Sequence, residues 1–164
     1  MVTKTSLSAI RALIYIARNA EGRFLSPRRI AEDLHESPTY MAKVTRQLVR
    51  AGILRVEKGV KGGVRLSRPP DQVTLLAVVE ACQGTLVGGY CQPGCDLTSV
   101  CAYHRAAAEL HEAISGVLSR WTLTQLLQKP ASAIVMPDGM PCVMLSGISP
   151  AAFLTAGKHP VPEG

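Results

Sequence analysis

The sequence predicts a mainly α-helical fold that carries one small β-hairpin. Apolar residues recur at helical spacing in several segments, whereas residues 53–67 contain two short apolar runs around a glycine-rich tip. Hydrophobic residues make up 47% of the 164 residues and aromatic residues only 4%, so we expect an aliphatic core. A chain of this length can bury one modest core, or form a small domain with an appendage.

Three predicted helices occupy the chain before the hairpin. Residues 5–22 place apolar side chains at helical spacing and reach Gly22, which suits a helix end. Residues 26–35 and 37–52 both begin with a Ser-Pro pair. Such a pair places a capping hydroxyl just before a proline at the first helical position, so each segment carries its own start signal.

The third predicted helix has two distinct faces. Its apolar stripe consists of Met41, Val44, Leu48 and Val49. Hydrogen-bond donors and positive charges lie mostly off that stripe, at Thr39, Tyr40, Lys43, Arg46 and Gln47. A short helix, a brief turn and a second helix with a polar, basic face fit a helix-turn-helix in which the second helix is the recognition helix.

The sequence ILRVEKGVKGGVRLS, residues 53–67, predicts the hairpin. Its glycines permit a tight tip and a close approach of the backbone, and Lys58 and Lys61 can reach phosphates or a minor groove. Taken alone, a tip of this kind is usually a solvated turn. Three helices followed by a basic hairpin, however, is the order of a winged helix-turn-helix domain, which predicts DNA binding.

Charge is distributed unevenly along the chain. Residues 1–68 hold 14 Lys and Arg against 5 Asp and Glu, a net charge of +9, whereas residues 69–164 carry −3. A basic half favours a polyanionic partner such as nucleic acid. A solvated surface of mixed charges is the alternative on charge alone.

More helices are predicted after the hairpin. Residues 74–84 begin at Thr74 as the cap and end at Gly84, and residues 122–127 form a short helix. Residues 99–121 predict a long helix with the apolar stripe Ala107, Leu110, Ile114, Val117 and Trp121. A helix this apolar beside a small basic domain suggests pairing with a second copy, because two-fold dimers match two-fold DNA half-sites.

Four soft ligands lie within fourteen residues, at Cys91, Cys95, Cys101 and His104. The sequence shows no signal-peptide pattern, and clustered cysteines in an intracellular protein indicate metal or redox chemistry rather than disulfides. If a helix has begun by Cys101, His104 shares its face and both side chains can reach one metal. Three thiolates and an imidazole suit a 2Fe–2S cluster or one tetrahedral zinc, and the residues alone do not separate these two.

Residues 1–127 resemble the bacterial family of winged-helix regulators that includes IscR and NsrR. The resemblance lies in YMAKVTRQLVRAGILRVEKGVKGG, VTLLAVVEACQG, the cysteine cluster and TLTQLL. It implies a homodimer crossed through the long helix, with the recognition helix in the major groove of double-stranded DNA and the wing near the minor groove. It also implies an iron–sulfur cluster, 2Fe–2S rather than 4Fe–4S, bound by Cys91, Cys95 and Cys101.

Two features depart from that family. The first two cysteines have three residues between them, where family loops usually have five or more. Residues 5–8, where some relatives carry a carboxylate ligand for the partner's cluster, hold no acid, which leaves His104 as the better fourth ligand. The DNA contacts that we expect are to bases from Thr39, Tyr40 and Lys43, to phosphates or through the wing from Arg28, Arg46, Lys58 and Lys61, and from Ser37 at the helix start.

These patterns divide the chain into three parts. We expect a winged helix-turn-helix domain at 1–68, the cluster loop and dimerisation helices at 69–127, and a C-terminal extension at 128–164. The extension contains a predicted hairpin, with a disordered tail as the alternative. No run of about 18 apolar residues predicts a membrane span, so we expect a cytoplasmic protein that does not engage a membrane.

The sequence therefore predicts a homodimeric transcription regulator, for instance a repressor. Its operator binding would follow an iron–sulfur cluster that senses redox state, nitric oxide or iron–sulfur status. A zinc-stabilised or thiol-switch DNA-binding regulator is the alternative. A thiol oxidoreductase is a weaker alternative, because the chain has no CxxC motif and no nucleophile–base pair that can be placed in a pocket, so we expect no enzyme activity.

Overall fold

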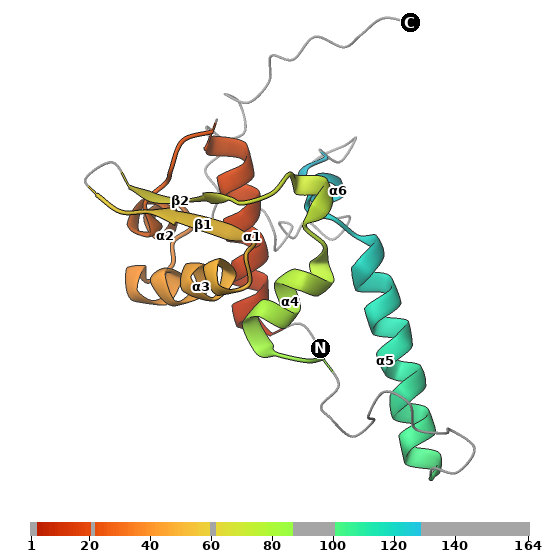
Figure 1. The fold of residues 1–164 in the computed structure, drawn as a ribbon. Coiled ribbons are helices and arrows are strands. Elements are labelled where there is room, and N and C mark those ends of the chain that lie inside the picture. Colours follow the sequence, from red (N-terminus) through yellow and green to blue (C-terminus); the bar gives the residue numbers. More distant parts are fainter. Residues whose placement is uncertain (1–2, 21, 60–61, 87–100, 129–164) are drawn as a thin grey trace, which may run out of the picture.

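The computed structural model describes residues 3–20, 22–59, 62–86 and 101–128. The expected ligands Cys91 and Cys95, the tip lysine Lys61 and all predicted features of residues 129–164 lie outside this part. The elements are α1 (Lys4–Asn19), α2 (Pro27–Asp33), α3 (Pro38–Arg50), β1 (Leu54–Glu57), β2 (Gly63–Leu66), a 3-10 turn (Pro70–Gln72), α4 (Leu75–Gln83), α5 (Ala102–Arg120) and α6 (Leu123–Leu127) (Figure 1). The prediction of a mainly α-helical fold with a small hairpin is confirmed.

Local capping signals set most helix boundaries. The Ser26 hydroxyl accepts a hydrogen bond from the backbone N–H of Arg29 at the start of α2, and the Thr74 hydroxyl does the same for Ala77 at the start of α4. α4 is followed by Gly84, whose φ of 78° continues the chain in a conformation that other residues rarely adopt. α1 ends at Asn19, three residues before the end predicted at Gly22.

Helix α1 runs through the centre of the fold and carries much of the core. Its buried residues are Ser6, Ser8, Ala9, Ile10, Ala12, Leu13, Ile14, Tyr15 and Ile16. It packs against α2, α3, α4, α6 and β2. The same cluster of buried residues includes Met41 from α3, Val78 from α4 and Leu123 from α6. Residues on both sides of position 68 therefore contribute to one core.

The hairpin packs onto the helical layer through a third short segment. β1 and β2 are antiparallel, with Leu54 opposite Leu66 and Val56 opposite Val64, and Val64 also exchanges two backbone hydrogen bonds with Leu25. A side chain at Gly63 would collide with the backbone of Leu25. The predicted need for glycine near the tip thus has a steric cause, which is close contact between backbones.

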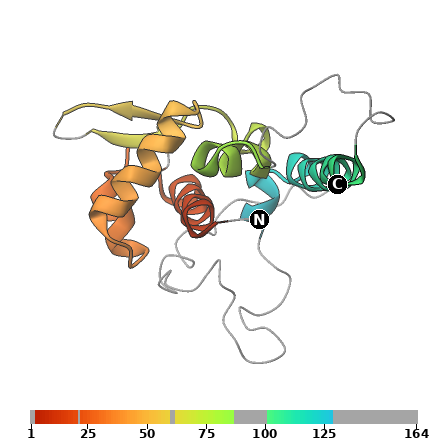
Figure 2. The same ribbon diagram turned by 90° about the horizontal axis from the view of Figure 1, so that it is seen from below.

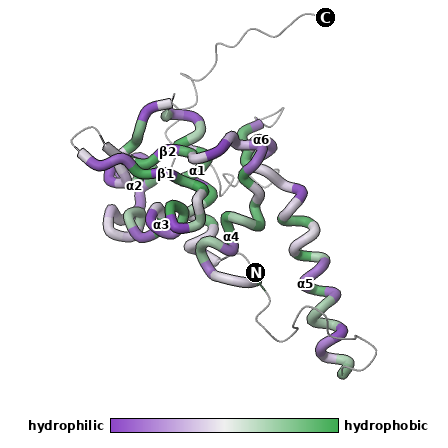
Figure 3. Tube along the Cα trace, in the orientation of Figure 1, coloured by the Kyte–Doolittle hydropathy of each residue, from purple (hydrophilic) through white to green (hydrophobic). Residues whose placement is uncertain are grey.

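Helix α5 stands apart from the body. Seen from below, α4 lies between α1 and α5, and the described part of α5 packs mainly on α4 (Figure 2). None of its residues is buried. Its tube alternates between hydrophobic and hydrophilic stretches along its whole length, whereas α1 is more continuously hydrophobic (Figure 3). No helix in the described part of the chain is long and apolar enough to cross a bilayer.

The turn between α2 and α3 contains the only non-glycine residue with a positive φ in the described part, His35 at 54°. The left-handed region brings the Cβ of an ordinary residue too close to backbone oxygen, a strain that glycine avoids. We predict that His35→Gly raises the free energy of unfolding by about 0.5–1 kcal/mol, measured by urea denaturation.

Gly52 provides the matched control for that prediction. It has a φ of 69° and no atom within 4 Å of the position that a Cβ would take. Gly52→Ala should therefore lower the free energy of unfolding by about 1 kcal/mol through backbone conformation alone. A loss of stability in His35→Gly would show that the His35 side chain contributes more than its backbone strain costs.

Candidate nucleic-acid interface and metal site

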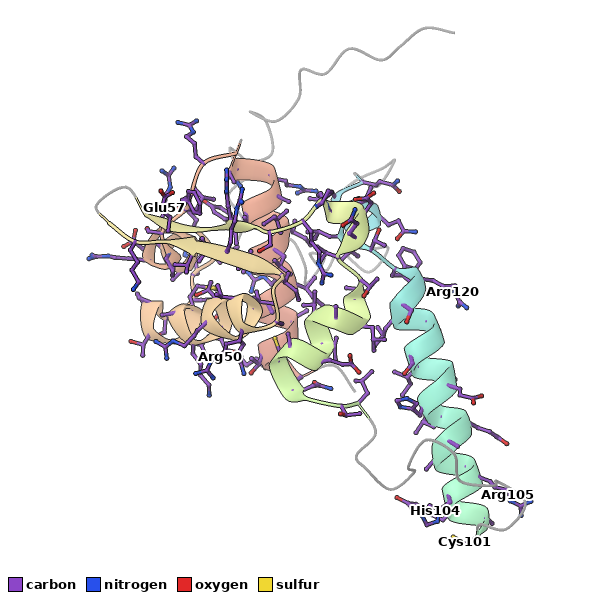
Figure 4. All side chains as sticks on the ribbon, in the orientation of Figure 1. Arg50, Glu57, Cys101, His104, Arg105 and Arg120 are labelled. Carbon is purple, nitrogen blue, oxygen red and sulfur yellow. The ribbon has the colours of Figure 1, made fainter. Side chains whose placement is uncertain are left out.

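The outer face of α3 carries a row of polar and basic side chains. Thr39, Lys43, Arg46 and Arg50 are exposed and follow one another at three- or four-residue intervals, so they lie along one side of the helix. The opposite side is buried and fixes the helix rotation. Within the described residues none of the three cations forms an ion pair. Arg50 points away from the body (Figure 4).

Other expected DNA contacts lie in different surroundings. The Tyr40 hydroxyl donates to Thr5 Oγ1 at 3.3 Å and thereby holds α3 against α1. Arg28 Nε lies 2.9 Å from Glu32 Oε1, but both side chains are largely exposed, and an exposed pair of this kind is weak enough to yield to a phosphate. Ser37 and Lys58 are exposed, and the Ser37 hydroxyl makes no capping hydrogen bond.

A shallow hollow separates the recognition helix from the wing. Its volume is about 260 Å³, and its lining is mainly apolar, with Ala42 and Val49 from α3, Val56 and Val64 from the wing, and Arg46. Arg50 belongs to the basic face of α3 although it was not among the predicted DNA contacts. The signal was present, because Arg50 follows Arg46 by four residues.

The soft-ligand pair lies at the far end of α5. α5 begins at Ala102, three residues later than predicted, and Cys101 is its N-cap residue with an extended backbone. Cys101 Sγ and His104 Nδ1 are 3.1 Å apart, and Cys101 is exposed. Figure 4 shows both side chains at the tip of α5, well away from the recognition helix. The hydrogen bond with the His104 ring lowers the pKa of the Cys101 thiol below its ordinary value.

These two side chains fit a soft metal centre. Bonds of about 2.3 Å to sulfur and about 2.0 Å to nitrogen at a tetrahedral ion separate the two donor atoms by about 3.5 Å. The observed separation reaches that value after small side-chain rotations. In the described part of the chain no group of three or more His, Cys, Asp or Glu side chains converges. A complete site therefore requires ligands from elsewhere, such as Cys91 and Cys95.

Two other regions supply no ligand. Ser6, near the start of α1, is fully buried, and its hydroxyl donates to Gln83 Oε1 at 3.2 Å. It is thus committed to the packing of α1 on α4. Cys82 lies on α4 against the core, and burial raises the pKa of its thiol to about 11. This thiol stays protonated near neutral pH, as is usual for a cysteine packed among apolar side chains.

The helix-turn-helix, its basic outer face and the adjoining hairpin define a winged helix-turn-helix DNA-binding protein. The chain belongs to the Rrf2 family, described as iron-dependent transcriptional regulators, whose family model matches residues 2–129. The protein is accordingly a DNA-binding transcriptional regulator and not an enzyme. A relative in Rhizobium meliloti (strain 1021), the protein aau3, is 30% identical over 131 residues, covering 77% of this chain and 84% of the relative.

Solved structures of the same architecture agree with this assignment. The global cysteine regulator CymR (YrzC) of B. subtilis superposes with a TM-score of 0.62 at 19% identity, over 77% of this chain and 95% of CymR. CymR of Staphylococcus aureus gives 0.61 at 21%, over 79% and 100%. IscR of T. potens gives 0.61 at 21%, over 77% and 85%. At these identities the likeness establishes the fold.

The pairing of Cys101 with His104 makes a reactivity prediction. In metal-free protein at pH 7, iodoacetamide should label Cys101 roughly threefold or more faster than in His104→Ala, because loss of the imidazole returns the thiol pKa toward its ordinary value and lowers the thiolate fraction. Mass spectrometry of the Cys101 peptide measures the rate. Cys82, with a pKa of about 11, is the internal control and should stay unlabelled. Equal rates in both proteins would contradict the assigned interaction.

Proposed function

We propose that the protein is a homodimeric regulator whose operator binding depends on an iron–sulfur cluster of the 2Fe–2S type, with Cys91, Cys95, Cys101 and His104 as ligands. The observation that carries the proposal is the Cys101–His104 pair, two soft donors 3.1 Å apart at the first turn of a helix. The family description as iron-dependent and the similarity to IscR of T. potens support iron over zinc.

A bound cluster would supply a redox-active group that oxidants and nitric oxide can attack. The residues of the chain supply the link to DNA. As cluster ligands, Cys101 and His104 would attach the start of α5 to the cluster. The chain that includes residues 87–100 connects the start of α5 to the end of α4. Because α4 packs on α1 and α3, a change in how this segment is held can reach the recognition helix through packed elements. A dimer binds two DNA half-sites at a fixed spacing, so a shift of its recognition helices would change its affinity for the operator.

The exposed apolar side chains of α5 support a second copy as the partner. Tyr103, Leu110 and Val117 recur every seven residues, a spacing typical of a helix–helix seam. These residues and Trp121 are between 46% and 65% exposed in a single chain. Large apolar side chains gathered on one exposed helix are typical of an interaction surface. A two-fold partner would also place two recognition helices on one DNA.

We assign the DNA contacts from the positions of these residues on α2, on the exposed face of α3 and on the wing. Thr39 and Lys43, on the first two turns of α3, would face base edges, while Arg46, Arg50 and Lys58 would meet phosphates. Tyr40, which also remains a candidate base contact, positions α3 through Thr5. Ser37 and Arg28 would bind the flanking phosphate, and Lys61 is assigned to the wing contact from its sequence position. A regulator of this kind would act on the chromosome in the bacterial cytoplasm.

Metal and sulfide analysis of anaerobically purified protein tests this function. We expect a brown protein with about two iron and two sulfide per chain. Cys101→Ala should lose both, whereas Cys82→Ala should keep both, because Cys82 is a core thiol with a raised pKa. About four iron and four sulfide per chain would indicate a 4Fe–4S cluster and would contradict the assignment of His104 as a ligand. Colourless protein with one zinc per chain would contradict the cluster.

The dimer makes a separate prediction. Leu110→Glu places a carboxylate on the apolar face of α5 and should convert the dimer to a monomer in analytical ultracentrifugation, with loss of high-affinity DNA binding. Ser119→Glu is the matched control, because nine residues at 100° each place it on the opposite side of the helix. A dimer that survives Leu110→Glu would place the interface elsewhere.

A further inference from the structure

A side chain of the recognition helix contacts the end of α4. Gln47 Nε2 donates to the backbone carbonyl of Cys82 at 3.3 Å. The last carbonyls of a helix have no partner within that helix, so they need one from outside. In α4 the carbonyl of Glu80 is satisfied by the N–H of Gly84, while the carbonyl of Cys82 is satisfied by Gln47. The contact therefore joins α3 to the C-terminal turn of α4.

The other end of the Gln47 amide is not satisfied in the described part of the chain. The carbonyl of Cys82 can only accept, so the nitrogen of the amide must face it and the oxygen must point away. That oxygen, Oε1, is buried and has no hydrogen-bond partner among the described residues. A buried acceptor without a partner costs stability, so stability alone does not account for this glutamine. The geometry instead suits a side chain that positions one helix against the other.

The two ends of α4 are held in different ways. Its start is fixed by the main chain, since the Leu75 N–H donates to the Trp121 carbonyl and the Leu123 N–H donates to the Val73 carbonyl. Its end is held by side chains, from Gln47 on α3 and from the buried Ser6 on α1, whose hydroxyl donates to Gln83. The segment that carries Cys91 and Cys95 leaves from this second end.

We propose that Gln47 is a positioning residue that couples the C-terminal turn of α4 to the recognition helix. Lys43 lies one turn before Gln47 on α3, and Arg46 is its neighbour. A displacement of the end of α4 would therefore act on the DNA-facing residues through this hydrogen bond, in addition to the packing of α3 on α4. The regulatory part of this inference rests on the function proposed above, in which the state of residues 91–104 controls operator affinity. The mechanical link between α4 and α3 does not rest on it.

The test compares Gln47→Met, which keeps the length of the side chain but not the donor, with wild type. The DNA probe is the duplex that wild-type protein selects from a random-sequence pool. We measure Kd for cluster-loaded and cluster-free protein and take the ratio of the two. Loss of one hydrogen bond should bring this ratio about fivefold closer to one. Lys43→Met is the control, and it should weaken both forms by a similar factor and leave the ratio unchanged.

Hydrogen exchange at the Gly84 amide tests the link between α3 and α4 in protein that holds no cluster. This amide donates to the Glu80 carbonyl in the last turn of α4. By reciprocity, DNA bound to α3 of cluster-free wild type should slow its exchange, and Gln47→Met should remove most of that protection. Protection that stays at the wild-type level in Gln47→Met, at an unchanged thermal midpoint, overturns the link. A wild-type Kd ratio of one would contradict the proposed control of DNA binding by the cluster. Loss of protection in Gln47→Met would still establish the link between α3 and α4.

Discussion

The packing of α1 through the middle of the domain is the constraint on which the other elements depend. Its residues Ala9 and Ala12 are fully buried and small, which lets neighbouring helices approach closely, and larger side chains such as Leu13 and Ile16 fill the space around them. The helices of the helix-turn-helix, α4, α6 and the second wing strand all pack on it. The DNA-reading helix and the helix that leads toward the cysteines are consequently placed by one common support.

This arrangement separates two kinds of chemistry. Positive charge gathers on α3 and the hairpin, where it suits a polyanion, while the soft donors Cys101 and His104 lie at the far tip of α5. α4 lies between them and makes contact with α1, α3 and α5. The apolar side chains of α5 remain exposed in a single chain, which is the observation behind the proposed dimer.

Local signals made much of the fold predictable. The Ser-Pro pairs, the Thr74 cap and the Gly84 end each depend on near neighbours in the sequence, and the structure follows them, although the Ser37 hydroxyl makes no capping hydrogen bond. Gly63 of the hairpin is required instead by the backbone of Leu25, which is distant in the sequence. The Cys101–His104 pair was predictable for the same reason, since it needs only one turn of helix. Arg50 was missed although helical spacing alone would have placed it on the basic face.

Long-range contacts were not predictable in this way. Gln47 falls on the polar side of the α3 pattern, yet it is half-buried against α4, because its partner Cys82 is 35 residues away in the sequence. The contact of Tyr40 with Thr5 is hidden from the sequence for the same reason. The left-handed backbone of His35 has a local cause that its residue type hides: it follows the last turn of α2, where the Glu36 N–H donates to the Ala31 carbonyl, at a position that glycine usually occupies.

The most direct test of the central claim is a single comparison of DNA affinity. Protein purified without oxygen is titrated onto its selected duplex, and the same preparation is titrated again after its metal has been removed, at one salt concentration. We predict Kd values that differ by about tenfold or more, within the range of ordinary allosteric coupling. Equal Kd values, with the dimer intact, would contradict it, and would describe a DNA-binding protein whose cysteines serve its structure and not its regulation.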